Sequence, residues 1–197
     1  MTRSVIQLGG KALKLDADGD TTIEVSSDDV LVVDTAGNEA LKIDASGHII
    51  KAKQAGWFAT ANDNTVLSNG AYTQPLLKNE LWDTGSDYDA ASSGTHRFTA
   101  PVAGKYFVVG SIGIASNGLG DTRLIISIWK NDYLHQYIGA NYSQGAQPYS
   151  ISGSTVVDLA ANDYLRMLIY VDGGNKNTDY RTDQQYLSTF FGGYLLG

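Results

Sequence analysis

The sequence predicts an all-β protein, and three observations point to that class. Its 197 residues include 22 glycines and 12 tyrosines but only 3 prolines, with many threonine, serine, valine and isoleucine residues, a composition typical of β-sheets. No long segment places apolar residues at the spacing of a helix. Short alternating apolar runs are separated instead by Gly, Asn and Asp. We therefore expect short strands joined by tight turns.

The composition also excludes several classes of function. The formal net charge of −7 disfavours nucleic acid and anionic membrane surfaces as partners. The absence of cysteine excludes disulfides, thiolate zinc sites and a cysteine nucleophile. No apolar run approaches the ~20 residues of a membrane helix, and the N-terminus lacks the apolar region of a secretory signal. We expect synthesis in a host cytoplasm without export by a signal peptide, and no membrane insertion.

The first quarter of the chain repeats one short pattern. Its three copies are LKLDADG (13–19), LVVDTAG (31–37) and LKIDASG (41–47). The alternating half of each copy predicts a short strand. The Asp-x-x-Gly half predicts a tight turn, because Asp accepts hydrogen bonds from backbone amides ahead of it and Gly adopts positive φ. About 50 residues in short strands bury little by themselves, so we expect stacking or the winding together of several chains.

The first copy also looks like the opening of a calcium loop. An EF-hand loop that began at Asp16 would need glycine at its sixth position and a bidentate glutamate at its twelfth. Thr21 and Ser27 stand at those positions. The same turn recurs in DTAG and DASG, where no acidic cluster exists. We favour a turn over a metal site, keep weak calcium binding as the alternative, and expect no other cofactor.

This apolar-x-apolar-Asp-x-x-Gly pattern resembles the shaft segments of bacteriophage tail fibres. The resemblance covers approximately residues 5–50 and implies that residues 1–53 form a β-repeat shaft or attachment segment, which binds other virion proteins. From Gln54 onward the strands lengthen, so residues 54–197 are predicted to form a separate head domain.

Three predicted strands of the head are apolar on both faces: KYFVVGSIGI (105–114), RLIISIW (123–129) and YLRMLIYV (164–171). In the first of them Tyr106 and Val108 share one face, while Phe107 and Val109 lie on the other. In a sheet with one solvent-exposed face, the strands would alternate apolar with polar residues. One apolar face packs the core of a sandwich, and the second needs a cover. Another subunit is the simplest cover.

Several of these stretches resemble the C1q-type globular domain. RFTAPVAGKYFV is similar to its signature of Phe, Pro and then Gly-x-Tyr; VVDLAANDYLRMLIY is similar to its later strand pair; and FGGYLLG is similar to its closing strand. Asn162 departs from the usual Gly of the Gly-Asp turn, and Val108 stands where the family usually has Phe. The resemblance covers about residues 54–197. It implies a jelly-roll sandwich of the C1q and tumour-necrosis-factor type, and a compact homotrimer.

The resemblance also assigns residues to the core or the trimer interface. These residues are Phe98, Tyr106, Phe191, Gly193 and Tyr194.

Catalytic motifs are missing from the sequence, so we expect no enzyme activity. His48, His96 and His135 are isolated, and neither a His-Glu-x-x-His motif nor a Gly-x-Ser-x-Gly elbow occurs. Aspartates gather in WDTGSDYDAASSG (82–94) and YVDGGNKNTDYRTD (170–183). Solvated loop acids are the simplest interpretation of both groups, with calcium, sugar contact or glycosidase chemistry as alternatives.

Tyrosines and amides concentrate in two segments that we expect to be head loops, residues 131–149 and 172–186. Tyrosine faces stack on sugars and amides bond sugar hydroxyls, so these segments suit an adaptable recognition surface. A place for the tyrosines at the trimer interface is equally compatible with their chemistry. The candidate ligand-binding residues are Tyr133, Tyr137, Tyr142, Asp172, Asn175 and Tyr180.

These patterns lead to one preferred function and two alternatives. The preferred function is a trimeric tail or head fibre on a bacteriophage virion, whose head recognises a host-surface polysaccharide or caps the trimer. The first alternative is a secreted bacterial C1q-like lectin or adhesin. The second is an enzyme that cleaves surface polysaccharide, which no constellation of residues supports.

Overall fold

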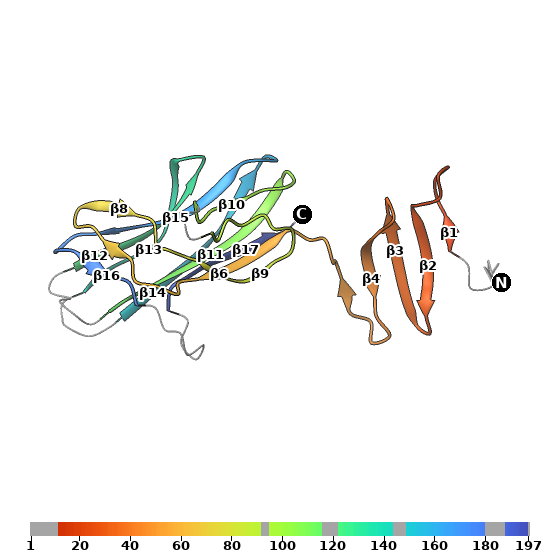
Figure 1. The fold of residues 1–197 in the computed structure, drawn as a ribbon, viewed down its shortest axis with the longest axis horizontal. Coiled ribbons are helices and arrows are strands. Elements are labelled where there is room, and N and C mark those ends of the chain that lie inside the picture. The colour runs from red at the N-terminus through yellow and green to blue at the C-terminus, as the bar shows by residue number, and fades with distance from the viewer. Residues whose placement is uncertain (1–11, 92–94, 116–121, 144–148, 180–187, 197) are drawn as a thin grey trace, which may run out of the picture. The chain divides into compact units, whose positions relative to one another are not determined.

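The computed structural model describes residues 12–91, 95–115, 122–143, 149–179 and 188–196 (Figure 1). The chain divides into two compact units, Met1–Gln54 and Ala55–Gly197. The division falls one residue after the boundary expected from the sequence. Every regular element in the described residues is a strand, which confirms the all-β class. Among these residues there is no helix with the length and apolar character that crossing a bilayer requires.

The N-terminal unit is a single antiparallel sheet in the order β1-β2-β3-β4-β5 (Figure 1). Its strands are β1 (Leu13–Lys14), β2 (Thr22–Ser27), β3 (Val30–Thr35), β4 (Asn38–Ile43) and β5 (Ile49–Ile50). Of its described residues only Thr22 and Val32 are buried, whereas Leu15, Val25 and Ile49 are exposed. A one-layer sheet has no second layer against which to bury its apolar side chains.

The repeated Asp-x-x-Gly pattern makes two kinds of turn. Asp16 Oδ1 accepts hydrogen bonds from the amides of Gly19 and Thr21, and Asp44 Oδ1 accepts from those of Ser46 and His48, as expected. In the middle copy the tight turn is confirmed at Ala36 and Gly37, with Gly37 at positive φ, but the role predicted for its aspartate was wrong. Asp34 lies in β3 and its carboxylate accepts from Thr22 Oγ1 at 3.1 Å, because that strand pairs directly with β2.

The C-terminal unit is a sandwich of two antiparallel sheets. The five-stranded sheet has the order β14-β11-β17-β6-β9, and the four-stranded sheet the order β10-β15-β12-β13. The strands of the first sheet are β6 (Gly56–Thr60), β9 (Asn79–Asp83), β11 (Gly104–Ile114), β14 (Tyr149–Leu159) and β17 (Phe190–Leu195). Those of the second are β10 (Phe98–Thr99), β12 (Thr122–Lys130), β13 (Tyr133–Ser143) and β15 (Tyr164–Val171).

Three short strands complete this unit. β7 (Val66–Leu67) pairs with β16 (Lys176–Asn177) in a two-stranded sheet. β8 (Ala71–Thr73) lies against β15 (Figure 1).

Aromatic rings fill the centre of the sandwich. Trp57 from β6 stacks on Phe98 with ring centroids 3.8 Å apart, and meets the Phe191 ring edge-on at 5.3 Å. Tyr106 packs against Phe98 from the other side of the core. All four side chains are fully buried. Gly193 lies against the Trp57 ring, where an added Cβ would come within 2.7 Å of Cη2.

The expectation that residues 131–149 form a loop was wrong. Tyr133–Ser143 is the edge strand β13, which pairs with β12 across two register shifts. A half-exposed edge strand needs no apolar alternation, so its polar residues and Gly139 obscured it. The hairpin between β12 and β13 turns at Asn131 and Asp132, which both have positive φ.

The turn between β14 and β15 carries a tight polar network. Asp163 Oδ2 lies 2.8 Å from Lys130 Nζ and accepts from the Ala160 amide, while Oδ1 accepts from Asn131 Nδ2 at 2.6 Å. Asn162, the departure from the family pattern, adopts positive φ at 71° in place of glycine. Hydrogen bonds led by that from Lys130 lower the pKa of Asp163 to about 2.

We expect Asp163→Asn to destabilise the protein by about 1 kcal/mol at pH 7, allowing for solvent screening of this pair. The folded pKa lies below the ordinary value of 3.8. The contribution is therefore complete above about pH 4 and declines as the pH falls through about 2. Urea unfolding at pH 7 and pH 2 measures it, with Asp158→Asn on β14 as the matched control. Equal stability of the Asp163→Asn variant and the wild type at pH 7 would contradict this account.

Candidate interaction surfaces

The chain itself covers the outer face of the four-stranded sheet over β12 and β15. The Tyr72 ring of β8 packs against the rings of Trp129 and Tyr170, with centroids 5.3 and 5.4 Å apart. Beneath this layer Ile125 and Ser127 are almost completely buried. The sequence predicted a second subunit as the cover for the second apolar face of these strands. For β12 and β15 the structure shows a cover within the same chain, because the Tyr72 ring of β8 packs on a ring of each strand.

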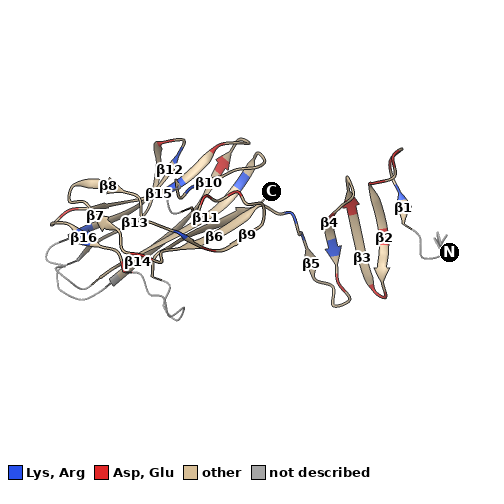
Figure 2. Ribbon diagram, in the orientation of Figure 1, with Lys and Arg blue, Asp and Glu red and all other residues tan. Residues whose placement is uncertain are grey.

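No described residue of the same chain covers the outer face of the five-stranded sheet in this way. We call the apolar side chains on it the aromatic face; they are Phe58, Trp82, Phe107, Val156, Phe190 and Tyr194. Trp82, Val156 and Tyr194 have exposed fractions of 47, 49 and 45 %. Strands β6 and β17 contain no charged residue and are uniformly tan in Figure 2. A face of this kind marks an interaction surface.

Outward-facing glycines flatten the aromatic face. A Cβ at Gly192 would meet Phe58 Cδ2 at 2.6 Å, and one at Gly56 would meet Trp82 Cζ3 at 2.9 Å. The rings of Phe58 and Trp82 therefore lie across these glycines. Phe58 also stacks on Phe190, with centroids 5.1 Å apart. Flat packed rings offer a large apolar area with little conformational freedom left to lose on binding.

The sequence missed most of the aromatic face. It placed Phe107 on the face opposite Tyr106 and assigned Tyr194 to the core or trimer interface, but it did not single out Phe58, Trp82 or Phe190. Strand β9 that carries Trp82 reads NELWD, which has no apolar alternation. The run FF in β17 puts Phe190 outward and Phe191 into the core, a distinction that only the register of the strand provides.

The candidate ligand-binding tyrosines lie on a strand. Tyr133, Tyr137 and Tyr142 of β13 have exposed fractions of 79, 50 and 54 %. The Tyr137 hydroxyl lies 2.6 Å from that of Tyr72, so Tyr137 is tied to the layer over the four-stranded sheet. Burial is the main reason that the pKa of Tyr72 rises to about 12, so the Tyr72 hydroxyl is protonated at neutral pH. Tyr180 lies outside the described residues.

Asp172 and Asn175 have local structural partners. Asp172 Oδ1 accepts a hydrogen bond from the Arg123 amide at 3.1 Å. Asn175 Oδ1 accepts from the Asn69 amide, and Asn69 Oδ1 accepts from the Gly174 amide, both at 2.9 Å. These bonds tie the turn after β15 to the segment between β7 and β8. Arg123 lies between Asp172 and Tyr142 in the register of the sheet, whereas Tyr133 lies at the opposite end of β13. The candidate residues are therefore not gathered into one site.

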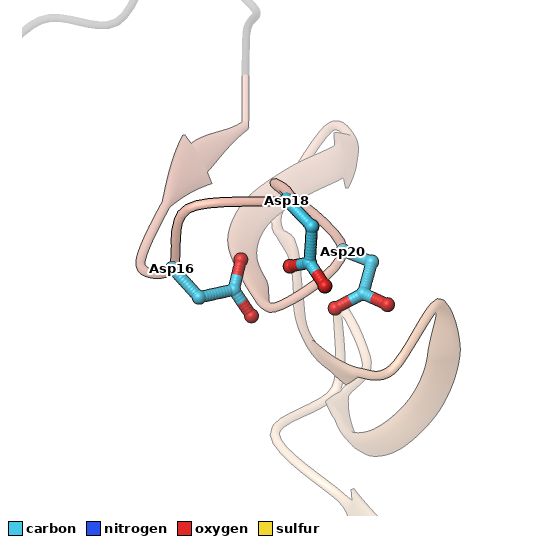
Figure 3. A group of neighbouring side chains, drawn as sticks. All are labelled: Asp16, Asp18 and Asp20. Atoms are coloured by element: carbon cyan, nitrogen blue, oxygen red, sulfur yellow. The ribbon is translucent and has the colours of Figure 1, made fainter.

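Three carboxylates of the first turn, Asp16, Asp18 and Asp20, face one another (Figure 3). Hydrogen bonding, chiefly to Thr21, lowers the pKa of Asp16. Partial desolvation and the charge of Asp16 raise the pKa of Asp20. The amide hydrogen bonds to Asp16 account for the turn, and we assign this loop a structural role.

The histidines show no catalytic arrangement among the described residues. His48 Nδ1 lies 2.9 Å from Asp44 Oδ2 in an exposed turn. His135 is exposed on β13. His96 is buried with positive φ, and burial lowers the pKa of its imidazole. Within the described chain no nucleophile is hydrogen-bonded to any of the three rings.

Solved structures share the architecture of the C-terminal unit. An Eiger TNF from S. frugiperda has a TM-score of 0.52 and 15 % identity, covering 74 % of this chain and 94 % of its own. Murine APRIL at pH 5.0 gives 0.53 and 13 %, covering 73 % and 100 %. The C-terminal unit has the C1q/TNF jelly-roll fold. This confirms the fold predicted for residues 54–197.

The globular domain of zebrafish complement 1qA protein matches with a TM-score of 0.49 and 16 % identity, covering 73 % of this chain and 98 % of its own. No family model matches the sequence, and no curated protein does. At these identities the C1q/TNF likeness is a likeness of fold alone. The aromatic face must therefore be interpreted from its own chemistry.

Proposed function

We propose that this protein is a homotrimeric adhesion fibre of a bacteriophage virion, with a C1q/TNF-like head on a β-repeat shaft. The observation that carries the proposal is the aromatic face on the five-stranded sheet. Three copies of the chain would pack these faces around a common axis, and the exposed loops and edges of the heads would contact the host surface.

The aromatic face has the chemistry of a subunit interface. Aromatic residues are enriched and charges depleted at the centre of such interfaces. Removing apolar area from water contributes roughly 25 cal/mol per Å². The covered four-stranded sheet and the uncovered five-stranded sheet leave one face available on each chain. A closed ring forms when this face of one copy packs against a different part of its neighbour's surface, and the C1q resemblance implies three chains in the ring.

The N-terminal unit supports a shaft. Its single sheet leaves Leu15, Val25 and Ile49 exposed, with exposed fractions of 53, 64 and 64 %. Winding with the same segment of two further chains would bury them. The tail-fibre resemblance of the repeat supplies the virion context, and attachment to other virion proteins would run through residues 1–53.

An adhesive role also fits the chemistry of the head. Among the described residues no serine or threonine hydroxyl is hydrogen-bonded to a histidine ring. Individually weak contacts to a host polysaccharide would add up across three heads, since linked sites gain avidity without new contacts.

Immunogold electron microscopy tests the virion assignment. We expect antibody raised against the full-length protein to label fibres on purified phage particles from a host that carries the gene. Antibody adsorbed with the protein beforehand is the control and should label nothing. Protein recovered from culture medium free of particles, with unlabelled virions, would contradict the proposal and favour a secreted lectin.

A further inference from the structure

A polar cavity of about 460 Å³ lies beside β10 in the head. Tyr88 and Phe98 form an antiparallel bridge, and both side chains point into the core. Because side chains alternate along a strand, their neighbours point the opposite way. These neighbours, which line the cavity, are Asp87, Asp89, Arg97 and Thr99. Such a volume lies within the range of small-ligand pockets.

Of the three aspartates Asp83, Asp87 and Asp89, only Asp87 has a side chain that accepts no hydrogen bond from the described residues. Asp83 accepts hydrogen bonds from the Gly85 and Tyr88 amides, and Asp89 accepts from Thr95. In the described residues no group donates to the buried Asp87 Oδ2. Burial, assisted by the charge of Asp83, raises the pKa of Asp87. Because Oδ2 is closed to solvent, a molecule in the cavity reaches this carboxylate through Oδ1, which also has no hydrogen-bond donor among the described residues. A ligand that donates to Oδ1 would offset part of the cost of burying the charge.

Arg97 supplies the complementary group. Its guanidinium lies 4.4 Å from the centre of the Tyr164 ring, and it forms no ion pair within the part of the chain that the structure describes. Residues diagonally opposed on paired strands lie about 7–8 Å apart, which places Asp87 and Arg97 within reach of one small molecule. Ser86, Thr99 and Asn162 add hydroxyl and amide groups to the lining.

The two charges restrict the chemistry of the ligand. A cation that paired with Asp87 would meet the positive charge of Arg97, and an anion that paired with Arg97 would meet Asp87 and Asp89. A neutral group that both donates and accepts hydrogen bonds can pair with the Asp87 carboxylate and the Arg97 guanidinium together. Adjacent hydroxyls of a sugar are such a group. We infer that this cavity binds a neutral sugar residue, with Asp87 accepting from its hydroxyls and Arg97 donating to them. The biological meaning of this site rests on the proposed adhesive role.

Saturation-transfer NMR and calorimetry on the full-length protein test the site. The probes are the methyl glycosides of glucose, galactose, mannose and N-acetylglucosamine, in buffer with EDTA. We expect at least one probe to bind in the millimolar range, and Asp87→Asn to weaken it at least tenfold. Asp28→Asn, the same charge change in an exposed turn of the other unit, should leave binding unchanged.

A thermal melt without sugar gives a second readout. Asp87→Asn removes an unpaired buried charge, so we expect an equal or higher Tm together with the lost affinity. A lower Tm, full affinity in the variant, binding that appears only with calcium, or no binding of any probe would each overturn the site. A trimer that binds no probe overturns the sugar site alone, whereas a monomer that binds one overturns the trimer alone.

Discussion

Val156→Glu should convert the trimer into monomers. Val156 lies on the aromatic face of β14 with an exposed fraction of 49 % in the single chain, opposite Phe107 in the register of the sheet. The substitution therefore adds no buried charge within one subunit. In a trimer it would bury one unpaired carboxylate per copy, at a cost of about 3–5 kcal/mol each. Light scattering at fixed protein concentration should give the mass of one chain, 21.1 kDa.

Val66→Glu is the matched control for this change. Val66 lies in β7, away from the aromatic face, with an exposed fraction of 57 %. The same substitution there should leave both the assembly and the fold as in the wild type. An unchanged mass for Val156→Glu, or dissociation of both variants alike, would show that the aromatic face is not part of the subunit interface.

Trp57→Ala should be the most destabilising single substitution in the core, at about 3–5 kcal/mol. Trp57 is fully buried between Phe98 and Phe191, and its loss opens a large cavity between the two sheets. A domain whose total stability is about 5–15 kcal/mol would lose a large share of it. Urea unfolding at a fixed protein concentration measures the change, because assembly makes the apparent stability depend on concentration.

Trp57→Phe separates ring packing from the indole. Trp57 Nε1 is buried without a hydrogen-bond partner in the described residues, so its removal costs nothing in hydrogen bonding. The phenyl ring retains most of the stacking on Phe98. We expect a clearly smaller loss than for alanine. A loss below about 1 kcal/mol for Trp57→Ala, as for a surface substitution, would contradict the central place of this ring in the core.

The sequence predicted the structure correctly where the alternation of apolar residues and the turn-forming residues indicate the same elements. Alternation in KYFVVGSIGI put Tyr106 and Val108 on one face and Phe107 on the other, and the structure shows the first face in the core. The AAND turn between β14 and β15 was also predicted, since Asp163 accepts local hydrogen bonds and Asn162 tolerates positive φ. Both features depend on residues close together in the chain.

The remaining features depend on residues far apart in the chain. Nothing near Trp129 or Tyr170 indicates that the ring of Tyr72, more than fifty residues earlier, packs against them. Edge strand β13 lacks an apolar pattern because only one of its sides is buried. The cavity at Asp87 follows from pairing between residues 86–89 and 97–99. The sequence shows only an acidic loop there. It does not show that Asp83 and Asp89 accept hydrogen bonds, whereas Asp87 Oδ2 has no donor in the described residues.

The solution mass of the full-length wild-type protein tests the central claim most directly. Light scattering behind size exclusion should give a single species of about 63 kDa, three times the chain mass of 21.1 kDa, at micromolar concentration and in physiological salt. A species of 21.1 kDa under those conditions would mean that the aromatic face stays exposed to solvent. That result would contradict the trimeric fibre proposed for this protein.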